Sequence, residues 1–329
     1  MTIGWGILAP GDIAHQFATE LALVPEARIA AVGSRDLGRA EAFTGRFGGT
    51  PYGSYAEMVE DPAVDVVYVA SPHGVHPEHT RLAMAAGKAV LCEKPIAVSA
   101  DQATALFAEA RERGVFLMEA MWTACHPLIR AMLARLAEGR YGEVRQVSAR
   151  LGFVMQPDKN ARLFDPALGG GSLLDMGIYP VTLATLVLGE PEATTALATL
   201  SDRSVDLDIA IAARYPGGAV AALSSSITGC LANTATIATT TGHLDLAEEF
   251  QHPTSITWTP LEHSGAAVPP AEEITGDEPI VGEGYGNEIL EVHRCLAAGR
   301  LTSDLVSPEQ SIAVLTQLDR LRHQAGIEL

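Results

Sequence analysis

The sequence predicts an α/β protein, with an N-terminal doubly wound parallel sheet and a C-terminal α+β domain that has a large, mostly antiparallel open sheet. Two observations predict this fold class. In the first 120 residues, short β-rich apolar runs alternate with stretches of helical spacing, as in βαβ units. After about residue 122, strand-like runs follow one another with only turn residues between them, which is typical of antiparallel strands.

The elements of the first part follow in chain order. Apolar runs predict strands at residues 3–8, 28–32, 64–70, 89–92 and 116–119. Helical spacing predicts helices at residues 13–24, 39–47, 77–86 and 100–113. Parallel strands that are joined by helices have their carboxyl ends at one edge of the sheet, so we expect the ligand site at that edge.

The second part begins with a helix at residues 127–138 and a long strand at 144–155. A glycine-rich opening leads into a helix at 172–188, and strands fill residues 193–258. The last helices are expected at 287–298 and 308–324, after an acidic surface loop at 262–285. A chain of 329 residues is long for one domain. We therefore expect a cofactor domain at 1–121 and a domain for substrate and subunit contacts at 122–329, with the last helix packing back on the first domain.

Composition limits the function classes. The net charge is −18, from 40 acidic and 22 basic residues, which argues against nucleic acid or an anionic membrane as the main partner. The N-terminus has no basic leader, and no run has the roughly 20 apolar residues of a membrane span. The four cysteines form no close pair, which favours a reducing compartment, and we expect a cytoplasmic protein. They are Cys92, Cys125, Cys230 and Cys295.

The turn after the first strand is a candidate phosphate site. Ala9-x-Gly11-x-x-Ala14 is a degraded form of the G-x-G-x-x-G pattern, in which small residues let a pyrophosphate approach the backbone at a helix start. We expect the segment Ala9, Gly11, Asp12 and Ile13 to bind this group in a Rossmann domain. Small residues are also common at any tight strand-to-helix turn, so the motif by itself leaves that alternative open.

The end of the second strand bears on which dinucleotide binds. Ser34 stands where NAD-specific sites have an acid for the ribose 2′-hydroxyl, and Arg35 and Arg39 follow it. A hydroxyl and guanidinium groups bind a 2′-phosphate, whereas a carboxylate repels it. We therefore expect NADP. Asp36 keeps NAD open, and a plain solvated loop is the structural alternative.

Lys94 follows the apolar strand at 89–92, at the expected ligand edge. The chain has only three lysines, so a lysine at this position is notable. Unlike arginine, a lysine can lower its pKa and exchange a proton. Glu93 holds Lys94 charged and oriented in one interpretation. In the other, the two residues only form an ion pair at the domain edge.

Asp175 and Tyr179 lie four residues apart in the helix predicted at 172–188, so both face the same way. Burying an aspartate in an apolar stretch without a partner is costly, which favours a functional or hydrogen-bonded role for Asp175. Tyr179 is either a catalytic phenol or a core aromatic with a satisfied hydroxyl.

Several motifs together resemble a known family. They are SPHGVHPEH at 71–79, AVLCEKP at 89–95, FLMEAMWT at 116–123 and GGGSLLDMGIYPV at 169–181, with GSRD and the phosphate turn before them. The chain resembles the Gfo/Idh/MocA oxidoreductases, and within them the branch of dimeric dihydrodiol dehydrogenases and NADP-dependent D-xylose dehydrogenases. The resemblance is strong over residues 3–190. Beyond them it extends only to the pattern of strands.

The resemblance implies roles for further residues. It places Ser71, Pro72 and His73 beside the cofactor, with His76 close by, and Arg162 near the nicotinamide or substrate end. Trp122 and Phe153 match aromatic residues of the substrate pocket. Tyr179 stands where many relatives have histidine.

Together with these residues, the resemblance implies a hydride-transfer enzyme. We expect it to act on a secondary or anomeric hydroxyl of a cyclic polyol, aldose or trans-dihydrodiol. Tyr179 accepts the substrate proton, its pKa lowered by the Lys94 ammonium, and Asp175 orients the substrate or the lysine. Lys94 itself as the acid/base stays open. The alternatives are a ketosugar or inositol reductase of the same family and a non-catalytic dinucleotide-sensing regulator.

Two expectations concern metals and partners. The histidines of the 71–79 segment have metal-like spacing, but a proline interrupts them and no cysteine or carboxylate completes the set, so we expect no metal. The uncharged run Thr234–Thr241 predicts a sheet face that pairs two subunits. We expect a homodimer or a higher homo-oligomer that binds a small-molecule substrate, with no nucleic-acid partner.

Overall fold

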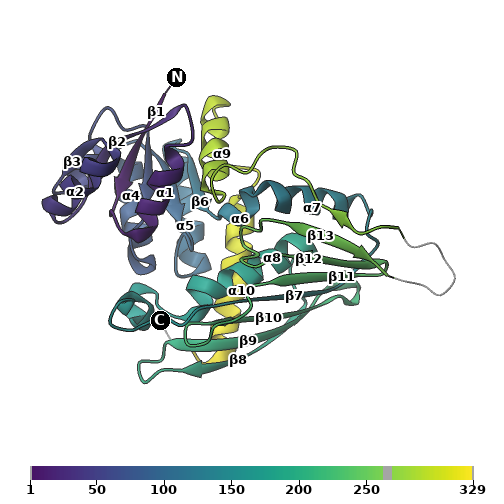
Figure 1. Cartoon of the computed structure of the whole chain (residues 1–329). Coiled ribbons are helices and arrows are strands. Elements are labelled where there is room, and N and C mark those ends of the chain that lie inside the picture. Colours follow the sequence, from purple (N-terminus) through teal and green to yellow (C-terminus); the bar gives the residue numbers. More distant parts are fainter. Residues whose placement is uncertain (1, 262–268, 328–329) are drawn as a thin grey trace. The chain divides into compact units, whose positions relative to one another are not determined.

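The computed structural model describes residues 2–261 and 269–327 (Figure 1). The chain divides into two compact units. The first unit comprises Met1–Cys125 and Ile280–Leu315, and the second comprises His126–Pro279 and Thr316–Leu329. These units are defined by contacts between residues, so they do not test the domain boundary that we expect at residue 121. That boundary stays a prediction.

The first unit is built on a six-stranded parallel sheet with the order β3-β2-β1-β4-β5-β6. Its strands are β1 (Ile3–Leu8), β2 (Ala27–Gly33), β3 (Thr50–Tyr52), β4 (Val66–Val69), β5 (Ala89–Glu93) and β6 (Leu117–Ala120). This order confirms the doubly wound sheet. The strand order reverses between β1 and β4, which is where such sheets bind ligands. The register sets Leu8 beside Gly33 and Val69, so the turns that follow these strands share one edge.

Helices connect these strands, and several begin at a side-chain cap. Asp36, Ser54 and Ser99 each accept a hydrogen bond from a backbone N–H in the first turn of the helix that follows. The helices are α1 (Asp12–Leu21), α2 (Leu37–Phe47), α3 (Tyr55–Val59), α4 (His76–Ala85), α5 (Ala100–Arg113), α6 (Trp122–Cys125) and α9 (Tyr285–Ala297), with the 3₁₀ turn His73–Val75 before α4. The sequence analysis missed β3 and α3, which are too short to show a period.

The second unit is built on an eight-stranded sheet with the order β14-β13-β12-β11-β7-β10-β9-β8. Its strands are β7 (Val144–Gly152), β8 (Ala193–Leu200), β9 (Asp206–Arg214), β10 (Val220–Ser226), β11 (Ala235–Thr239), β12 (Gly242–Leu246), β13 (Ile256–Pro260) and β14 (Glu272–Glu273). Only β7 and β10 pair in parallel. The mostly antiparallel sheet is therefore confirmed.

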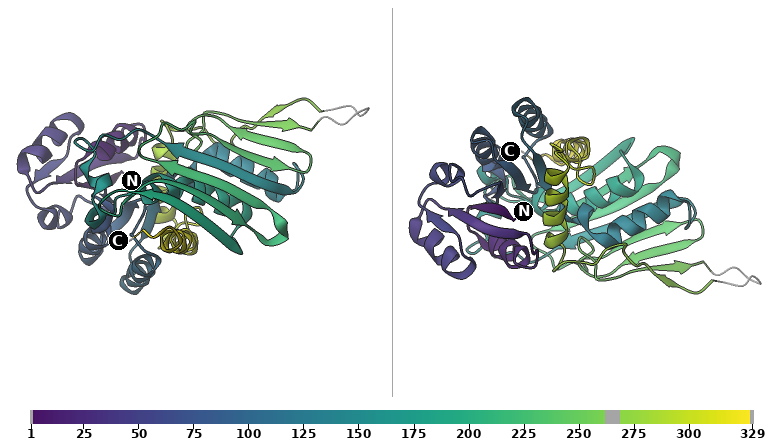
Figure 2. Two further views of the ribbon diagram at one scale, coloured as in Figure 1. Left: turned by 90° about the horizontal axis from the view of Figure 1, so that it is seen from below. Right: turned by 90° about the horizontal axis from the view of Figure 1, so that it is seen from above.

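Helices α7 (Pro127–Ala137) and α8 (Ile178–Leu188) lie on one face of this sheet (Figure 2). The strands alternate accordingly: in β9, Ile209, Ile211 and Ala213 are buried, whereas Ala210 and Ala212 are exposed. This alternation is typical of a sheet with one covered face. The long helix α10 (Pro308–Ala325) runs from the first unit into the second.

Two details of the second part differ from expectation. The helix expected at 172–188 is present, but Leu173–Gly177 within it form a π-helix that continues directly into α8. Pro180 lies in the third position of α8 and has no N–H for the helical bond back to residue 176, so the preceding turn widens. The loop expected at 262–285 contains β14, which pairs with β13, and its last residue begins α9. Residues 262–268 of that loop lie outside the described residues.

The helical stretch Pro166–Leu188 is long and apolar enough, by length and composition, to cross a membrane. However, 78% of its most apolar window is buried inside the fold. This degree of burial is what the core helix of a water-soluble protein shows.

Candidate active site

The expected phosphate turn lies at the switch point of the first sheet. Ala9 has a φ of +71°, the left-handed backbone conformation that usually requires glycine. The Gly11 N–H donates to the Ala9 carbonyl at 2.9 Å, and Gly11 is the N-cap of α1. A Cβ at Gly11 would meet nothing within 4 Å, so the backbone is open in that direction. With Asp12 and Ile13 in or beside the first turn of α1, this segment has the geometry of an anion site at a helix N-terminus.

The residues after β2 fit a 2′-phosphate. Ser34 is buried, while Arg35 and Arg39 are exposed, and Arg39 reaches the Pro10 carbonyl at 3.4 Å. The Asp36 carboxylate accepts the Gly38 N–H at 2.9 Å as the cap of α2. One oxygen of this carboxylate is thus already bonded to the backbone at the start of α2.

The residues after β4 and β5 are tied together by His76. Its ring nitrogens lie 2.6 Å from the Ser71 carbonyl and 2.8 Å from the Pro95 carbonyl. The side chain is fully buried, and burial lowers its pKa to about 3. A neutral imidazole donates one hydrogen bond, so one carbonyl receives the proton and the other faces an acceptor nitrogen. The neutral His76 ring therefore lies between the Ser71–Pro72–His73 segment and the loop that carries Lys94, and it donates a hydrogen bond to one of them. In that loop the Lys94–Pro95 peptide bond is cis.

A second tie on the lysine loop comes from Glu119 in β6. Its carboxylate accepts the Ile96 N–H at 2.9 Å and the Ser311 hydroxyl of α10 at 2.6 Å. Burial raises the pKa of Glu119, while these two hydrogen bonds and the Lys94 charge act against that rise. The backbone two residues beyond Lys94 is thus fixed to the neighbouring strand.

The Glu93 side chain enters a buried acidic cluster. Glu93 accepts a hydrogen bond from the Tyr68 hydroxyl, and Glu288 of α9 is fully buried nearby. Burial, followed by the charges of Glu93 and Glu20, raises the pKa of Glu288 well above its usual value. This shift favours the protonated form of Glu288. The Tyr68 hydroxyl and the Glu288 carboxyl thus both act on the Glu93 side chain.

In the second unit, Asp175 lies in the π-helix and Tyr179 in the first turn of α8. Both residues are buried. Arg162, in the loop before the glycines, forms an ion pair with Asp175 at 3.3 Å. The expected partner of Asp175 is thus an arginine of the same unit.

The two expected pocket aromatics lie in different units. Trp122 is buried in the first unit, where it stacks on Tyr285 with ring centroids 4.2 Å apart. Phe153 follows β7 in the second unit and is half-buried, with its N–H bonded to the Ser226 carbonyl at 3.1 Å. The Trp122 ring is thus held by a partner that is distant in sequence, whereas Phe153 is fixed through its backbone.

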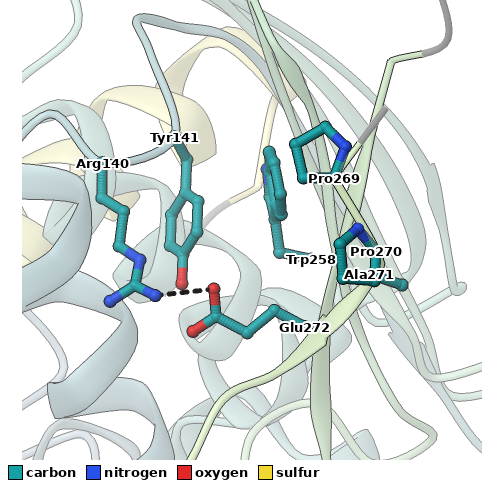
Figure 3. A pocket seen from close by; sticks show the side chains of 7 residues that line it. All are labelled: Arg140, Tyr141, Trp258, Pro269, Pro270, Ala271 and Glu272. Carbon is teal, nitrogen blue, oxygen red and sulfur yellow. Dashed lines mark hydrogen bonds and ion pairs between the residues drawn. The ribbon is translucent and has the colours of Figure 1, made fainter. Parts of the chain in front are cut away.

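A cavity of about 430 Å³ opens in the second unit, away from all of the expected site residues (Figure 3). Its aromatic walls, Tyr141 and Trp258, stack with centroids 5.2 Å apart. Its charged groups, Arg140 and Glu272, pair with each other at 3.0 Å. Because these charges neutralise each other, the cavity offers no group prepared for acid–base chemistry. Among the described residues, no group of three or more histidine, cysteine or acidic side chains is arranged to hold a metal ion.

Sequence reasoning missed two buried acids at this site, Glu119 and Asp206. Asp206 accepts hydrogen bonds from Ser172 and Leu173, at the start of the stretch that carries Asp175 and Tyr179. The available signal was an acidic residue within or at the start of an apolar strand: Glu119 lies in β6, and Asp206 begins β9. Their partners are distant in sequence, however, so the spacing of residues could not identify them.

Comparison with known families agrees with this geometry. Residues 3–121 match the sequence model of an oxidoreductase family with an NAD-binding Rossmann fold, GFO_IDH_MocA. Residues 129–245 match the model of the GFO/IDH/MocA C-terminal domain.

Individual proteins match over nearly the whole chain. Trans-1,2-dihydrobenzene-1,2-diol dehydrogenases from Sus scrofa and Bos taurus are each 36% identical, with 99% of this chain and 98% of each relative covered. Among solved structures, the 3-ketoreductase KijD10 from Actinomadura kijaniata, in complex with NADP and TDP-benzene, is 30% identical with a TM-score of 0.87. That match covers 99% of this chain and 98% of KijD10. Variants of KijD10 with one lysine or one tyrosine replaced have also been solved.

Proposed function

Because the chain belongs to the Gfo/Idh/MocA oxidoreductase family, we propose that it is an NADP-dependent dehydrogenase for a secondary or anomeric hydroxyl group of a cyclic polyol, aldose or trans-dihydrodiol. The proposed substrate class rests on one observation. The curated relatives that align over nearly the full length of both chains are dihydrodiol dehydrogenases. A small-molecule substrate with adjacent hydroxyl groups follows for this chain.

The first unit supplies the residues that would hold the cofactor. The Ala9–Ile13 segment takes the pyrophosphate, and Ser34, Arg35 and Arg39 take the 2′-phosphate. Segment Ser71–His73, together with His76, Glu93 and Lys94, forms the nicotinamide side. The exposed guanidinium groups of Arg35 and Arg39 beside Ser34 support NADP over NAD. When bound, NADP accepts or donates the hydride.

The chain's own residues handle the proton. Tyr179 accepts the proton of the substrate hydroxyl during oxidation and returns it during reduction. The Lys94 ammonium stabilises the phenolate by its charge. Asp175 orients the substrate and is itself held by Arg162. In the second assignment, Lys94 is the acid/base and Tyr179 only hydrogen-bonds the substrate. Trp122 and Phe153 provide apolar surface for the ring of the substrate, and Arg162 adds a positive charge at the same end.

The test is a turnover assay with NADP⁺ and with NAD⁺ on a trans-dihydrodiol, D-xylose, D-glucose and a set of cyclic polyols, followed by NADPH absorbance. We expect turnover of at least one of these, with a higher kcat/KM for NADP⁺ than for NAD⁺. The likeness to a 3-ketoreductase supports a second candidate, a ketosugar reductase. Turnover of ketosugars with NADPH, and of none of the diols and aldoses, would favour that enzyme instead.

The second unit also supports a homodimer. The sheet face opposite α7 and α8 presents exposed small and apolar side chains on adjacent strands, among them Leu197, Ala210, Ala212, Val220 and Ala222. The Thr234–Thr241 run, which includes β11, adds uncharged residues beyond β7, where Arg150 interrupts this face. We propose that a second copy of the chain covers this face. We also propose that the enzyme works in the cytoplasm. Light scattering at micromolar concentration tests the dimer, and a monomer mass would contradict it.

A further inference from the structure

The helical stretch that carries Asp175 and Tyr179 begins at a buried carboxylate. Asp206, the first residue of β9, is 2% exposed. Its Oδ2 accepts a hydrogen bond from the Ser172 hydroxyl at 2.8 Å and another from the Leu173 N–H at 2.6 Å. Leu173 is the first residue of the π-helix. One oxygen atom on the sheet therefore fixes the start of this stretch.

The surroundings of Asp206 restrict where that start can lie. Behind Ser172, the Ser225 hydroxyl of β10 donates to the Ser172 hydroxyl at 3.2 Å. Gly171 has a φ of +116°, and a Cβ there would lie 2.1 Å from Asp206 Oδ1. The second carboxylate oxygen thus packs against bare backbone. A shift of the helix start would break both hydrogen bonds or push the carboxylate into the glycine turn.

The charge of Asp206 strengthens this anchor. Hydrogen bonds to an ionised acceptor are roughly twice as strong as neutral ones, and the N-terminus of a helix attracts negative charge. Burial raises the pKa of Asp206 to about 6, against the hydrogen bonds from Leu173 and Ser172, which lower it. The carboxylate is therefore charged at neutral pH and becomes protonated below pH 6.

The charged groups on the elements around Asp206 have partners of their own. In the preceding loop and helix, Arg162 pairs with Asp175, and Asp165 pairs with Arg203. On β9 itself, Asp208 binds the hydroxyl groups of Ser226 and Thr228, and β10 faces Asp206 with serine. These pairings leave hydrogen bonds and burial as the main causes that set the protonation of Asp206.

We propose that Asp206 is a positioning residue, whose ionised carboxylate fixes the start of the π-helix and thereby the placement of Asp175 and Tyr179. The inference rests on the proposed function of those two residues. It predicts that turnover depends on the charge of Asp206, a residue of the sheet that binds the start of the π-helix.

The test compares the wild type with Asp206→Asn between pH 5 and pH 8.5. The amide oxygen keeps an acceptor for Ser172 and Leu173 but removes the charge. At pH 8 we expect kcat to fall about fivefold, with the KM for NADP⁺ unchanged. Below pH 6 the wild type is itself protonated, so the ratio of the two kcat values should approach one. Asp208→Asn is the matched control on the same strand, and its ratio to wild type should not change with pH.

A second measurement separates this inference from the proposed function. If the wild type converts no diol, polyol or sugar, the proposed function fails, and hydrogen exchange still tests the anchor. We expect protection factors for residues 172–179 to rise between pH 7 and pH 5 in the wild type, because opening of this stretch returns Asp206 to its lower unfolded pKa and releases its proton. In Asp206→Asn they should not change over this range. A kcat ratio that is constant with pH, or the same pH dependence of protection in Asp206→Asn as in the wild type, would overturn the inference.

Discussion

The loop that carries Lys94 and the helix that carries Tyr179 are held by different physical means. The lysine loop is tied through its backbone: His76 binds the Pro95 carbonyl and Glu119 binds the Ile96 N–H. Burial drives His76 to its neutral form and raises the pKa of Glu119. The tyrosine helix is instead held at its start by Asp206, which is ionised at neutral pH.

This difference matters because the neutral imidazole of His76 and the ionised carboxylate of Asp206 respond differently to pH. A neutral hydrogen bond in the core changes little with pH until one partner titrates. A buried charge costs stability, and a protein retains it where it does something that a neutral group does less well. We therefore expect the position of the lysine loop to change little with pH and the position of the tyrosine helix to depend on pH. The following predictions can break or sharpen this comparison.

The largest effects should come from the reactive side chains themselves. Lys94→Ala and Tyr179→Phe should each lower kcat by roughly 10²–10⁴-fold, the usual contribution of general acid–base catalysis. The increase in melting temperature caused by NADP should persist, because the Ala9–Ile13 and Ser34–Arg39 contacts remain. Near-normal kcat in both variants at saturating NADP⁺ would show that neither region carries the chemistry.

The glycine turn under Asp206 should be the most sensitive position for folding. Gly171→Ala puts a Cβ 2.1 Å from a buried carboxylate and forces alanine to a φ of +116°. We expect the free energy of unfolding to fall by roughly 2–6 kcal/mol, from backbone strain and overpacking together. Gly189→Ala is the control: its φ is also positive, at +78°, but its Cβ would meet nothing within 4 Å. If Gly171→Ala and Gly189→Ala lost equal free energy of unfolding in denaturant titrations, the Asp206 carboxylate would add nothing to the cost of the Gly171 substitution.

How much of this could be predicted from the sequence depends on the range of each interaction. The strand at 3–8 and the helix at 100–113 are confirmed to the residue, because apolar runs and helical periods are local signals. The phosphate turn is equally local. The hydrogen bond between Ser172 and Asp206 joins residues 34 positions apart, and that between Glu119 and Ser311 joins residues 192 apart. Such pairs depend on the tertiary fold, and no spacing rule identifies them.

On the lysine side, Glu119→Ala should leave the buried Ile96 N–H and the Ser311 hydroxyl without their acceptor. Leaving a buried donor unpaired costs about 1–3 kcal/mol, so we expect a loss of that size in the free energy of unfolding. The looser loop should also lower kcat about tenfold, a barrier increase of about 1.4 kcal/mol. Glu119→Gln is the matched variant, since its amide oxygen still accepts the Ile96 N–H. If both variants unfold like the wild type in denaturant titrations, the tie to β6 does not hold the loop.

The two anchors should also show opposite effects of pH on stability. The pKa of His76 falls from 6.5 to about 3 on folding, so the unfolded chain takes up a proton first and His76 costs stability as pH falls from 6.5 to 3. The pKa of Asp206 rises from 3.8 to about 6, so the folded chain takes up a proton first and stability increases as pH falls from 6 to 3.8. Each slope should approach about 1.4 kcal/mol per pH unit.

Unfolding of His76→Gln and Asp206→Asn by denaturant at several pH values measures these slopes as differences from the wild type. With falling pH, His76→Gln should gain relative to the wild type, and Asp206→Asn should lose. Slopes of the same sign would contradict the contrast between a neutral and a charged anchor.

The smallest effect on stability should come from the ion pair between Arg162 and Asp175. The arginine side chain is 44% exposed, and exposed ion pairs contribute only about 0–1 kcal/mol, because water and salt screen them. Arg162→Gln should therefore change the melting temperature by no more than a few degrees. Its effect on catalysis should be larger, because Asp175 would lose the partner that orients it while the Asp206 anchor stays intact. We expect a higher KM for the substrate and an unchanged pH profile below pH 6. If Arg162→Gln abolished the change in kcat below pH 6, as Asp206→Asn is expected to do, the ion pair between Arg162 and Asp175 would be the source of this pH dependence. Asp206 would then not be its source.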